Sequence, residues 1–334
     1  MNLSTRYLGL ELKHPIVASA SPLTADLDGI RRLADADAAA IVMASIYEEQ
    51  VVAEELGQVA LLEHGSETQA EATGYFPEVP QDRGVLAGRL ETLRRAAEGA
   101  GVPIIASLNG KSRSGWVDFA VQLEQAGASA IELNIYRVPA DPEESGEALE
   151  RSYVDILRAV KARVGVPVAV KLSPYFSSPG NMAKHLVDAG ADGLVMFNRF
   201  YEPDIDLASL KAQPDFQLST AYDIRLPLMW IALLSGRLNT SLAATTGVWT
   251  SNEAVKYLLV GADAVMTTSA LLKHGPNHLA TLVNGLREWM EGRGFDSISA
   301  LKGRLAAGRH LADPAAFMRV EYREILSSRY ESMR

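Results

Sequence analysis

A weakly repeated ten-residue pattern constrains the fold of this chain more than any other feature of its sequence. The pattern occurs at residues 36–45, 126–135, 189–198 and 260–269. Each copy begins as the end of a helix and continues as an apolar run of strand length. Three copies carry a glycine where a helix commonly ends in the left-handed conformation, namely Gly127, Gly190 and Gly261. The repeat predicts helix–strand units that recur along the chain.

Four further apolar stretches complete a set of eight predicted strands. They lie at residues 15–19, 102–108, 166–172 and 240–244. Two of them open with a Val-Pro step, and proline is tolerated at the first residue of a strand. All eight runs are continuously apolar instead of alternating, which indicates strands that are buried on both faces and therefore parallel.

Helical patterns separate these strands. Trp116, Phe119 and Leu123 fall on one helical face, and Thr250 with Glu253 forms a capping box at the start of another helix. Eight strands alternating with helices predict an α/β protein with a (β/α)8 TIM barrel. The alternative is an open doubly wound sheet, but that fold expects a glycine-rich first turn, and residues 19–23 contain no glycine.

Three segments are longer than a minimal barrel requires. Residues 47–85 follow the second strand, residues 199–222 follow the sixth, and residues 291–334 form a helical tail. The first two are inserted loops at the C-terminal ends of strands, where barrel active sites lie. They are either covers for a substrate site or parts of a subunit interface. We treat residues 1–334 as a single domain.

The composition excludes several classes of function. The 334 residues include no cysteine, so disulfides, thiolate metal sites, iron–sulfur clusters and a cysteine nucleophile are absent. A net charge of −9 argues against a nucleic-acid surface and a polybasic membrane anchor. His274 and His278 have metal-like spacing, but Gly275-Pro276 breaks the helix between them, so we predict no metal site. With no signal-peptide pattern at the N-terminus, we expect a soluble, cytoplasmic protein.

Polar residues at the C-terminal ends of the predicted strands are the candidates for chemistry. They are Ser45, Asn109, Asn134, Lys171, Asn198, residues 245–247 and residues 267–269. Because these strand ends converge at one rim of a barrel, three amides and one lysine are expected to meet there. Amides suit a ligand with amide-like edges, and a lysine supplies positive charge for an anion. The alternative role for each residue is to form hydrogen bonds with backbone groups of its own loop.

The ends of the seventh and eighth strands carry small and hydroxyl residues. Barrels often hold a phosphate at this position. The backbone N–H of Gly247 and the hydroxyls of Thr246, Thr268 and Ser269 are candidates to bind one. Ordinary helix capping, which the Thr250 box requires nearby, is the competing explanation.

Several motifs resemble the dihydroorotate dehydrogenases, particularly the soluble class 1 type. They are Glu132-Leu133-Asn134-Ile135, residues 170–176, Leu271-x-Lys273-x-Gly275-Pro276, residues 7–16 and Gly292-x-x-x-Asp296-Ser297-Ile298. The resemblance covers nearly the whole chain. It implies FMN over the barrel mouth and hydride transfer with a small planar amide or carboxylate substrate, dihydroorotate in pyrimidine biosynthesis. It also implies a homodimer, in some members with a separate electron-transfer partner.

The resemblance assigns roles to individual residues. Lys171 matches the lysine near N1 and O2 of the flavin, where a cation stabilises the reduced ring. Asn134 and Asn198 match residues that hold flavin and substrate, and Asn109 matches a position near the flavin. Gly74 matches the glycine of the substrate loop.

The sequence departs from the family at the catalytic base. After Asn134-Ile135 the chain reads Tyr136-Arg137-Val138-Pro139, without the expected Cys or Ser. Base catalysis contributes about 10²–10⁴-fold, so we expect slow or absent orotate formation, with Tyr136 as a candidate acid. The alternatives are a catalytically impaired nucleotide-binding or regulatory barrel and a flavin-free enzyme that uses Lys171 as a Schiff base.

The phosphate positions also depart from the family. The stretch Ala244-Thr245-Thr246-Gly247 stands where a double glycine is expected, and Thr268 replaces another glycine. Each substitution adds a Cβ where backbone should approach a ligand closely. We therefore expect hydroxyl groups to replace some backbone contacts, with Arg199 or Arg225 as the counter-charge.

Overall fold

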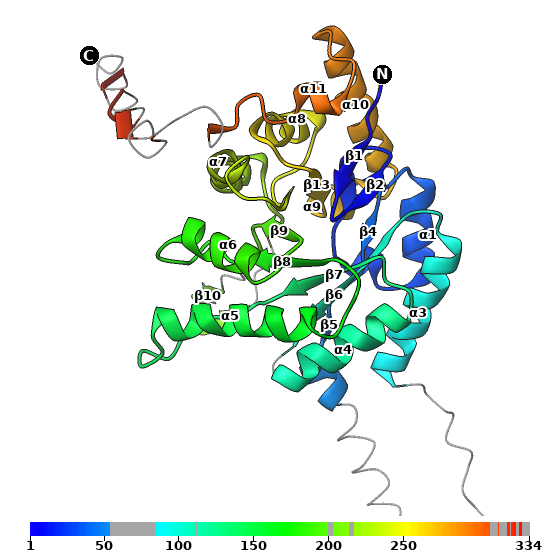
Figure 1. Ribbon diagram of the computed structural model, residues 1–334, viewed down its shortest axis with the longest axis vertical. Helices are drawn as coiled ribbons and strands as arrows, with labels where there is room; N and C mark the ends of the chain where they lie inside the picture. The colour runs from blue at the N-terminus through cyan, green and yellow to red at the C-terminus, as the bar shows by residue number, and fades with distance from the viewer. Residues whose placement is uncertain are drawn as a thin grey trace, which may run out of the picture.

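Eight parallel strands close into a barrel at the centre of the computed structural model, and helices surround them (Figure 1). The structure describes residues 1–53, 84–110, 112–199, 203–213, 217–307, 313, 319–320, 322–324 and 327–328. The barrel strands are β3 (Ile16–Ala18), β4 (Ile41–Val42), β6 (Ile104–Asn109), β7 (Ala130–Asn134), β8 (Val168–Leu172), β9 (Gly193–Met196), β12 (Ser241–Ala244) and β13 (Ala264–Thr267). Pairing of β4 with both β3 and β6 closes the ring. The predicted (β/α)8 barrel is confirmed, and the open sheet is excluded.

Helices alternate with the barrel strands along the chain. They are α1 (Leu27–Asp35), α3 (Val85–Gly99), α4 (Arg113–Gln125), α5 (Gly146–Lys161), α6 (Pro179–Asp188), α7 (Arg225–Leu234), α8 (Ser251–Val260), α9 (Ser269–His274), α10 (His278–Gly292) and α11 (Ile298–Leu301), with short 3-10 helices η1 (Pro22–Thr24) and η2 (Ala221–Ile224). On α4 the predicted face of Trp116, Phe119 and Leu123 is buried. The capping box at the start of α8 is present, because the Thr250 N–H donates to the Glu253 carboxylate at 2.8 Å.

The repeated pattern ends a helix in the same way in all four copies. Gly127, Gly190 and Gly261 have φ of 96°, 100° and 109°, as predicted. The fourth copy places Asp37 there with φ of 76°, and Asp tolerates this conformation better than most residues. In every copy the following alanine donates its N–H to the carbonyl five residues earlier, at 3.0–3.1 Å. This is the Schellman bond that stops a helix and turns the chain into the next strand.

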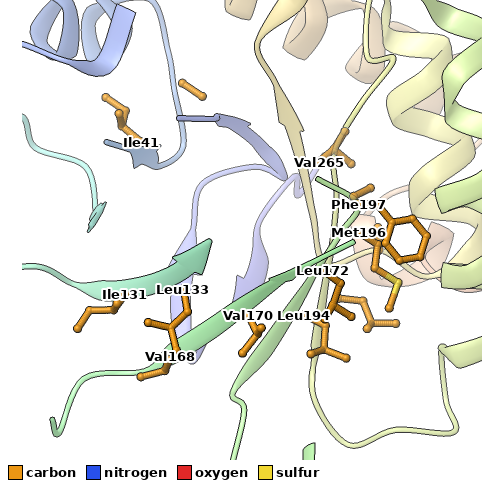
Figure 2. Close-up of a cluster of buried hydrophobic side chains, with 14 of the residues drawn as sticks. Ile41, Ile131, Leu133, Val168, Val170, Leu172, Leu194, Met196, Phe197 and Val265 are labelled. Atoms are coloured by element: carbon orange, nitrogen blue, oxygen red, sulfur yellow. The ribbon is translucent and has the colours of Figure 1, made fainter. Parts of the chain in front are cut away.

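The side chains of the barrel strands alternate between two apolar clusters. Ile131 and Leu133 of β7 pack with Val168 and Val170 of β8 in the cluster that faces the surrounding helices (Figure 2). Alanines from the same two strands belong to the cluster that fills the barrel interior. Because strand side chains alternate, Glu132 and Asn134 share the inward face of β7.

A hairpin at the N-terminus closes one end of the barrel. Strands β1 (Thr5–Tyr7) and β2 (Leu10–Leu12) pair antiparallel, and Tyr7, Leu8 and Leu12 join the interior cluster. The Leu8 N–H donates to the Ser241 hydroxyl at 3.1 Å, at the first residue of β12. The hairpin therefore closes the N-terminal ends of the strands, and the C-terminal ends remain for a site.

The two predicted insertions have different outcomes. Most of the segment at 47–85 lies outside the described residues, although β5 (Ile46–Tyr47) precedes it and pairs with the end of β6. The segment at 199–222 includes the antiparallel hairpin β10 (Asp204–Asp206) and β11 (Lys211–Gln213). The described part of the chain contains no helix with the length and apolar character needed to cross a membrane.

Candidate functional site

A cavity of about 720 Å³ opens at the C-terminal ends of the barrel strands. This volume lies in the range of roughly 300–1,000 Å³ that is typical of small-molecule and cofactor sites. The predicted site residues that line it are Asn134, Tyr136, Lys171, Asn198, Thr246, Gly247, Thr268 and Ser269. The chain order of the strands, combined with barrel closure, brings together residues that are far apart in the sequence.

The two carboxamides are hydrogen-bonded to each other. The Asn198 amide nitrogen donates to the Asn134 carbonyl oxygen at 2.6 Å, and the Asn134 amide nitrogen donates to the Ser45 hydroxyl at 3.3 Å. Ser45 in turn pairs with the hydroxyl of Ser107 at 2.8 Å. This chain of hydrogen bonds crosses the barrel rim and fixes how the amides are oriented towards the cavity.

Lys171 forms an ion pair with a residue below the cavity. It lies beside Asn134 in the register of β7 and β8, and its Nζ is 3.6 Å from Oε1 of Glu132. The side chain of Lys171 is 10% exposed and that of Glu132 only 1%. Within the described residues neither carboxylate oxygen of Glu132 has a hydrogen-bond partner. The ammonium group is therefore the main neutralising contact of a buried carboxylate.

Tyr7 lies in the barrel interior on the side of the hairpin. Burial raises the pKa of its hydroxyl well above the usual value, and the negative charges of Glu132 and Asp263 raise it further. The Tyr7 hydroxyl has no hydrogen-bond partner within the described residues. Tyr7 thus stays neutral, and Lys171 remains the cationic neighbour of Glu132.

Three predicted site residues are not among the described residues that line this cavity. Ser45 reaches it only through its hydrogen bond with Asn134. Asn109 ends β6, where it pairs with Tyr47 of β5, and it is buried without appearing among the described residues that line the cavity. Gly74, predicted as a substrate-loop glycine, lies outside the described residues.

The backbone at the end of β12 adopts the conformation that a glycine would favour. Thr246 has φ of 80° and Gly247 has φ of 74°. A β-branched residue is unfavourable there, by about 1–3 kcal/mol. The Tyr257 hydroxyl donates to the carbonyl oxygens of Thr245 and Thr246 at 3.2 and 3.0 Å, which supports this turn. Thr246 therefore holds a backbone conformation that the glycine expected from the family resemblance would adopt with less strain.

Ser219 forms hydrogen bonds with the polar groups that the sequence predicts for binding a phosphate. The Gly247 N–H donates to the Ser219 hydroxyl at 3.2 Å, and the hydroxyls of Ser219 and Ser269 are 2.8 Å apart. The Ser219 N–H also donates to Ser269 Oγ at 3.2 Å. The sequence places this segment near the site but assigns Ser219 no role, because its partners are 28 and 50 positions away.

Two tyrosines and an arginine complete the mouth of the cavity. Tyr136 is half-buried there, and Tyr47, which the sequence analysis missed, also lines the cavity. Burial raises the pKa of Tyr47, with contributions from Tyr136 and Glu49. Arg199 lines the cavity and donates to the Gln217 carbonyl. Arg225 instead stacks on the Tyr222 ring, 4.2 Å from its centroid, and is not among the described cavity residues.

The architecture and the cavity define a (β/α)8-barrel protein with a small-molecule site at the C-terminal rim. The dihydroorotate dehydrogenase family model matches residues 2–290, and the chain belongs to this family of oxidoreductases. It is 30% identical over 221 residues to a putative dihydroorotate dehydrogenase A (fumarate) of Aeropyrum pernix, covering 63% of this chain and 70% of that one.

Two further relatives carry related names. The dihydroorotate dehydrogenase B (NAD(+)) catalytic subunit of Shouchella clausii is 30% identical over 209 residues, which is 60% of this chain and 68% of that one. The dihydroorotate dehydrogenase A (fumarate) of Lactobacillus helveticus is 26% identical over 313 residues, which is 91% of this chain and 99% of that one.

Proposed function

We propose that this protein is an FMN-dependent oxidoreductase that transfers a hydride between flavin and a small planar substrate bearing amide or carboxylate groups. The observation that carries the proposal is the convergence of Lys171 with the bonded pair Asn134–Asn198 in one cavity. A cation and two amides complement a ring that has carbonyl oxygens and ring nitrogens along one edge.

The residues present fit the ring of a flavin better than its phosphate. The buried carboxylate of Glu132 fixes Lys171 at the base of the cavity, which leaves other N–H bonds of the ammonium for a ligand. The amides of Asn134 and Asn198 are oriented by their mutual hydrogen bond. At the other end, Gly247 and Ser269 are already bonded to Ser219. Our assignment of the cofactor therefore rests on the ring-binding residues.

The side chains have distinct roles in this proposal. When bound, the flavin supplies a ring position that accepts or donates a hydride. Lys171 stabilises negative charge on the ligand, and the two asparagines fix its orientation. Tyr136 lines the same cavity, and we assign its phenol the role of proton donor to the substrate. These groups favour a reaction in which the substrate is reduced and protonated, and not one in which it loses a proton and is oxidised.

The experiment is a titration of purified wild-type protein with FMN, followed by visible absorbance and flavin fluorescence. Saturable binding with a shifted ring spectrum is expected, and Lys171→Met is expected to weaken it at least about tenfold through loss of a charged contact. Lys184→Met is the control, because Lys184 lies on the exposed side of α6. Failure of wild-type protein to bind any flavin would refute the proposal.

The substrate named by the family, dihydroorotate, is the first compound to test for turnover. We expect slow oxidation, because Tyr136-Arg137 stands in place of the family's base. The same substitution favours a second candidate, a nucleotide-binding or regulatory barrel without turnover. Flavin that binds but is reduced by no substrate would support this second candidate.

The Schiff-base alternative is the least supported by the site. It requires a neutral, nucleophilic amine, whereas the Glu132 carboxylate 3.6 Å away binds the ammonium form of Lys171. Borohydride in the presence of a carbonyl compound is expected to leave Lys171 unmodified. A homodimer and a separate electron-transfer partner are proposals drawn from the family, and a cytoplasmic location is a proposal drawn from the sequence.

A further inference from the structure

The side chain of Ser219 takes the place of an anion oxygen at the phosphate end of the cavity. Its hydroxyl accepts from the Gly247 N–H at 3.2 Å and lies 2.8 Å from the Ser269 hydroxyl. These are two of the groups that the strand ends offer to a phosphate. Ser219 is buried and lines the cavity together with Gly247 and Ser269, so an anion there competes with its hydroxyl for these groups.

The segment that carries Ser219 is fixed on both of its sides. The Trp249 indole N–H donates to the Ser219 carbonyl at 2.6 Å. A Cβ added to Gly247 would lie 2.7 Å from the Thr220 carbonyl oxygen and 2.7 Å from Ile224 Cγ2, so this segment packs directly against the glycine. The bare backbone of Gly247 thus accommodates residues 220–224 of the chain itself, in addition to any ligand.

The described residues also supply no dedicated positive charge to the phosphate end. Among the described residues that line the cavity, the cationic side chains are Lys171 and Arg199. Lys171 is at the ring end with Glu132, and Arg199 donates to the Gln217 carbonyl. The carboxylate of Asp204 also lines the cavity, and its negative charge disfavours an anion there.

We propose that Ser219 sets the specificity of the cavity for the tail of its ligand, so that a flavin is bound through its ring and its phosphate adds little affinity. This proposal rests on the proposed function for the identity of the ring. The Ser219 hydroxyl satisfies the Gly247 N–H and the Ser269 hydroxyl without a ligand. A phosphate must displace it before gaining those hydrogen bonds. Ligands with a neutral tail avoid this exchange.

The first experiment compares the dissociation constants of riboflavin and FMN by quenching of flavin fluorescence. Wild-type protein is expected to bind the two within about threefold, since few charge-assisted bonds reach the phosphate. Ser219→Ala frees the Gly247 N–H and the Ser269 hydroxyl, and should increase the preference for FMN at least about tenfold. Ser235→Ala is the matched control, because Ser235 is a buried serine outside the cavity lining.

A second experiment separates this proposal from the identity of the ring. Inorganic phosphate is titrated into flavin-free protein by calorimetry, with wild-type, Ser219→Ala and Ser235→Ala compared. Saturable phosphate binding gained only by Ser219→Ala supports the role of Ser219, even if no flavin binds. Absence of flavin binding would contradict the proposed function and not the role of Ser219. Equal phosphate binding by all three proteins overturns the role of Ser219.

The wild-type measurement alone can also reject the proposal. A preference of wild-type protein for FMN over riboflavin of more than about tenfold would mean that the phosphate is bound despite Ser219. This comparison requires no variant, so it remains decisive if Ser219→Ala does not fold. Circular dichroism and a thermal melt of each variant establish folding before the binding assays.

Discussion

The ammonium of Lys171 lies 3.6 Å from a carboxylate oxygen of Glu132, and this contact joins the ligand cavity to the interior of the barrel. Both side chains are buried, and within the described residues the Glu132 oxygens have no hydrogen bond. Removing one member would leave the other as an uncompensated buried charge, whereas an apolar pair of similar volume would avoid it. The two residues are therefore expected to behave as one energetic unit.

Lys171→Met is expected to lower the free energy of unfolding by about 3–5 kcal/mol, because it leaves the buried carboxyl of Glu132 without its ion-pair partner. The double variant Lys171→Met with Glu132→Leu should recover most of this loss. Urea unfolding followed by circular dichroism measures both. Lys184→Met, which breaks an exposed pair with Asp188 one helical turn away, is the control and should change stability by less than about 1 kcal/mol. A double variant no more stable than the single one would mean that the charges are uncoupled.

The barrel could be predicted because its signals are local and repeated. A glycine stop followed by an apolar run is visible in three copies of the repeat, and the copy with Asp37 folds in the same way. That the hairpin of β1 and β2 closes one end of the barrel could not be predicted in this way. Its role depends on contacts such as that between Leu8 and Ser241, which are 233 positions apart.

Thr246→Gly is expected to stabilise the protein by about 1 kcal/mol. The residue has φ of 80°, which glycine adopts without steric strain, and the gain exceeds the loss of the 3.3 Å hydrogen bond from Thr246 Oγ1 to the Phe197 carbonyl. Urea unfolding again provides the measurement. Thr245→Gly is the matched control: its φ is not positive, so added backbone freedom in the unfolded chain should make that variant less stable than wild type. Equal effects of the two substitutions would argue against strain at Thr246.

The candidate site was predictable only in part. Strand-end position was enough to place Lys171, Asn134 and Asn198 in one cavity, because barrel closure brings strand ends together. Glu132 had a signal that sequence reasoning did not use, since it is a charged residue inside an apolar strand and two positions before Asn134. Ser219 has a weaker signal, since residues 218–222 stand where the family resemblance predicts a glycine-rich turn. Its contacts depend on how one long loop packs against two other strand ends.

Stability is expected to fall as pH rises above about 10, the ordinary pKa of tyrosine. Burial raises the pKa of Tyr153 to about 12, against the opposing positive charge of Arg137. The unfolded chain loses this proton first, so the native state binds more protons between these values and unfolding becomes easier. A shift of this size corresponds to about 2–3 kcal/mol, which is fully present below about pH 10 and lost by about pH 12.

The variant Tyr153→Phe tests this expectation through urea unfolding at several pH values. It removes the hydrogen bond from the phenol to the Ile135 carbonyl at 3.1 Å, so the variant should be less stable than wild type at neutral pH by about 1 kcal/mol. Above pH 10 its stability should fall less steeply than that of wild type. Tyr322→Phe, at an exposed tyrosine, should leave the slope unchanged. Identical slopes for wild type and Tyr153→Phe would contradict the assignment.

Tyr136→Phe separates proton donation from ligand binding. Tyr136 is half-buried in the cavity wall. Its backbone N–H donates to the backbone carbonyl of Asn134 at 2.9 Å, which ties Tyr136 to a residue of the proposed flavin site. If its hydroxyl protonates the substrate, kcat should fall by about 10²–10⁴-fold while flavin affinity stays within about threefold of wild type. Tyr47→Phe is the control, because Tyr47 lines the same cavity from a different strand. Wild-type turnover by Tyr136→Phe, or an equal loss in both variants, would remove Tyr136 as the specific acid and leave it the role of a wall residue.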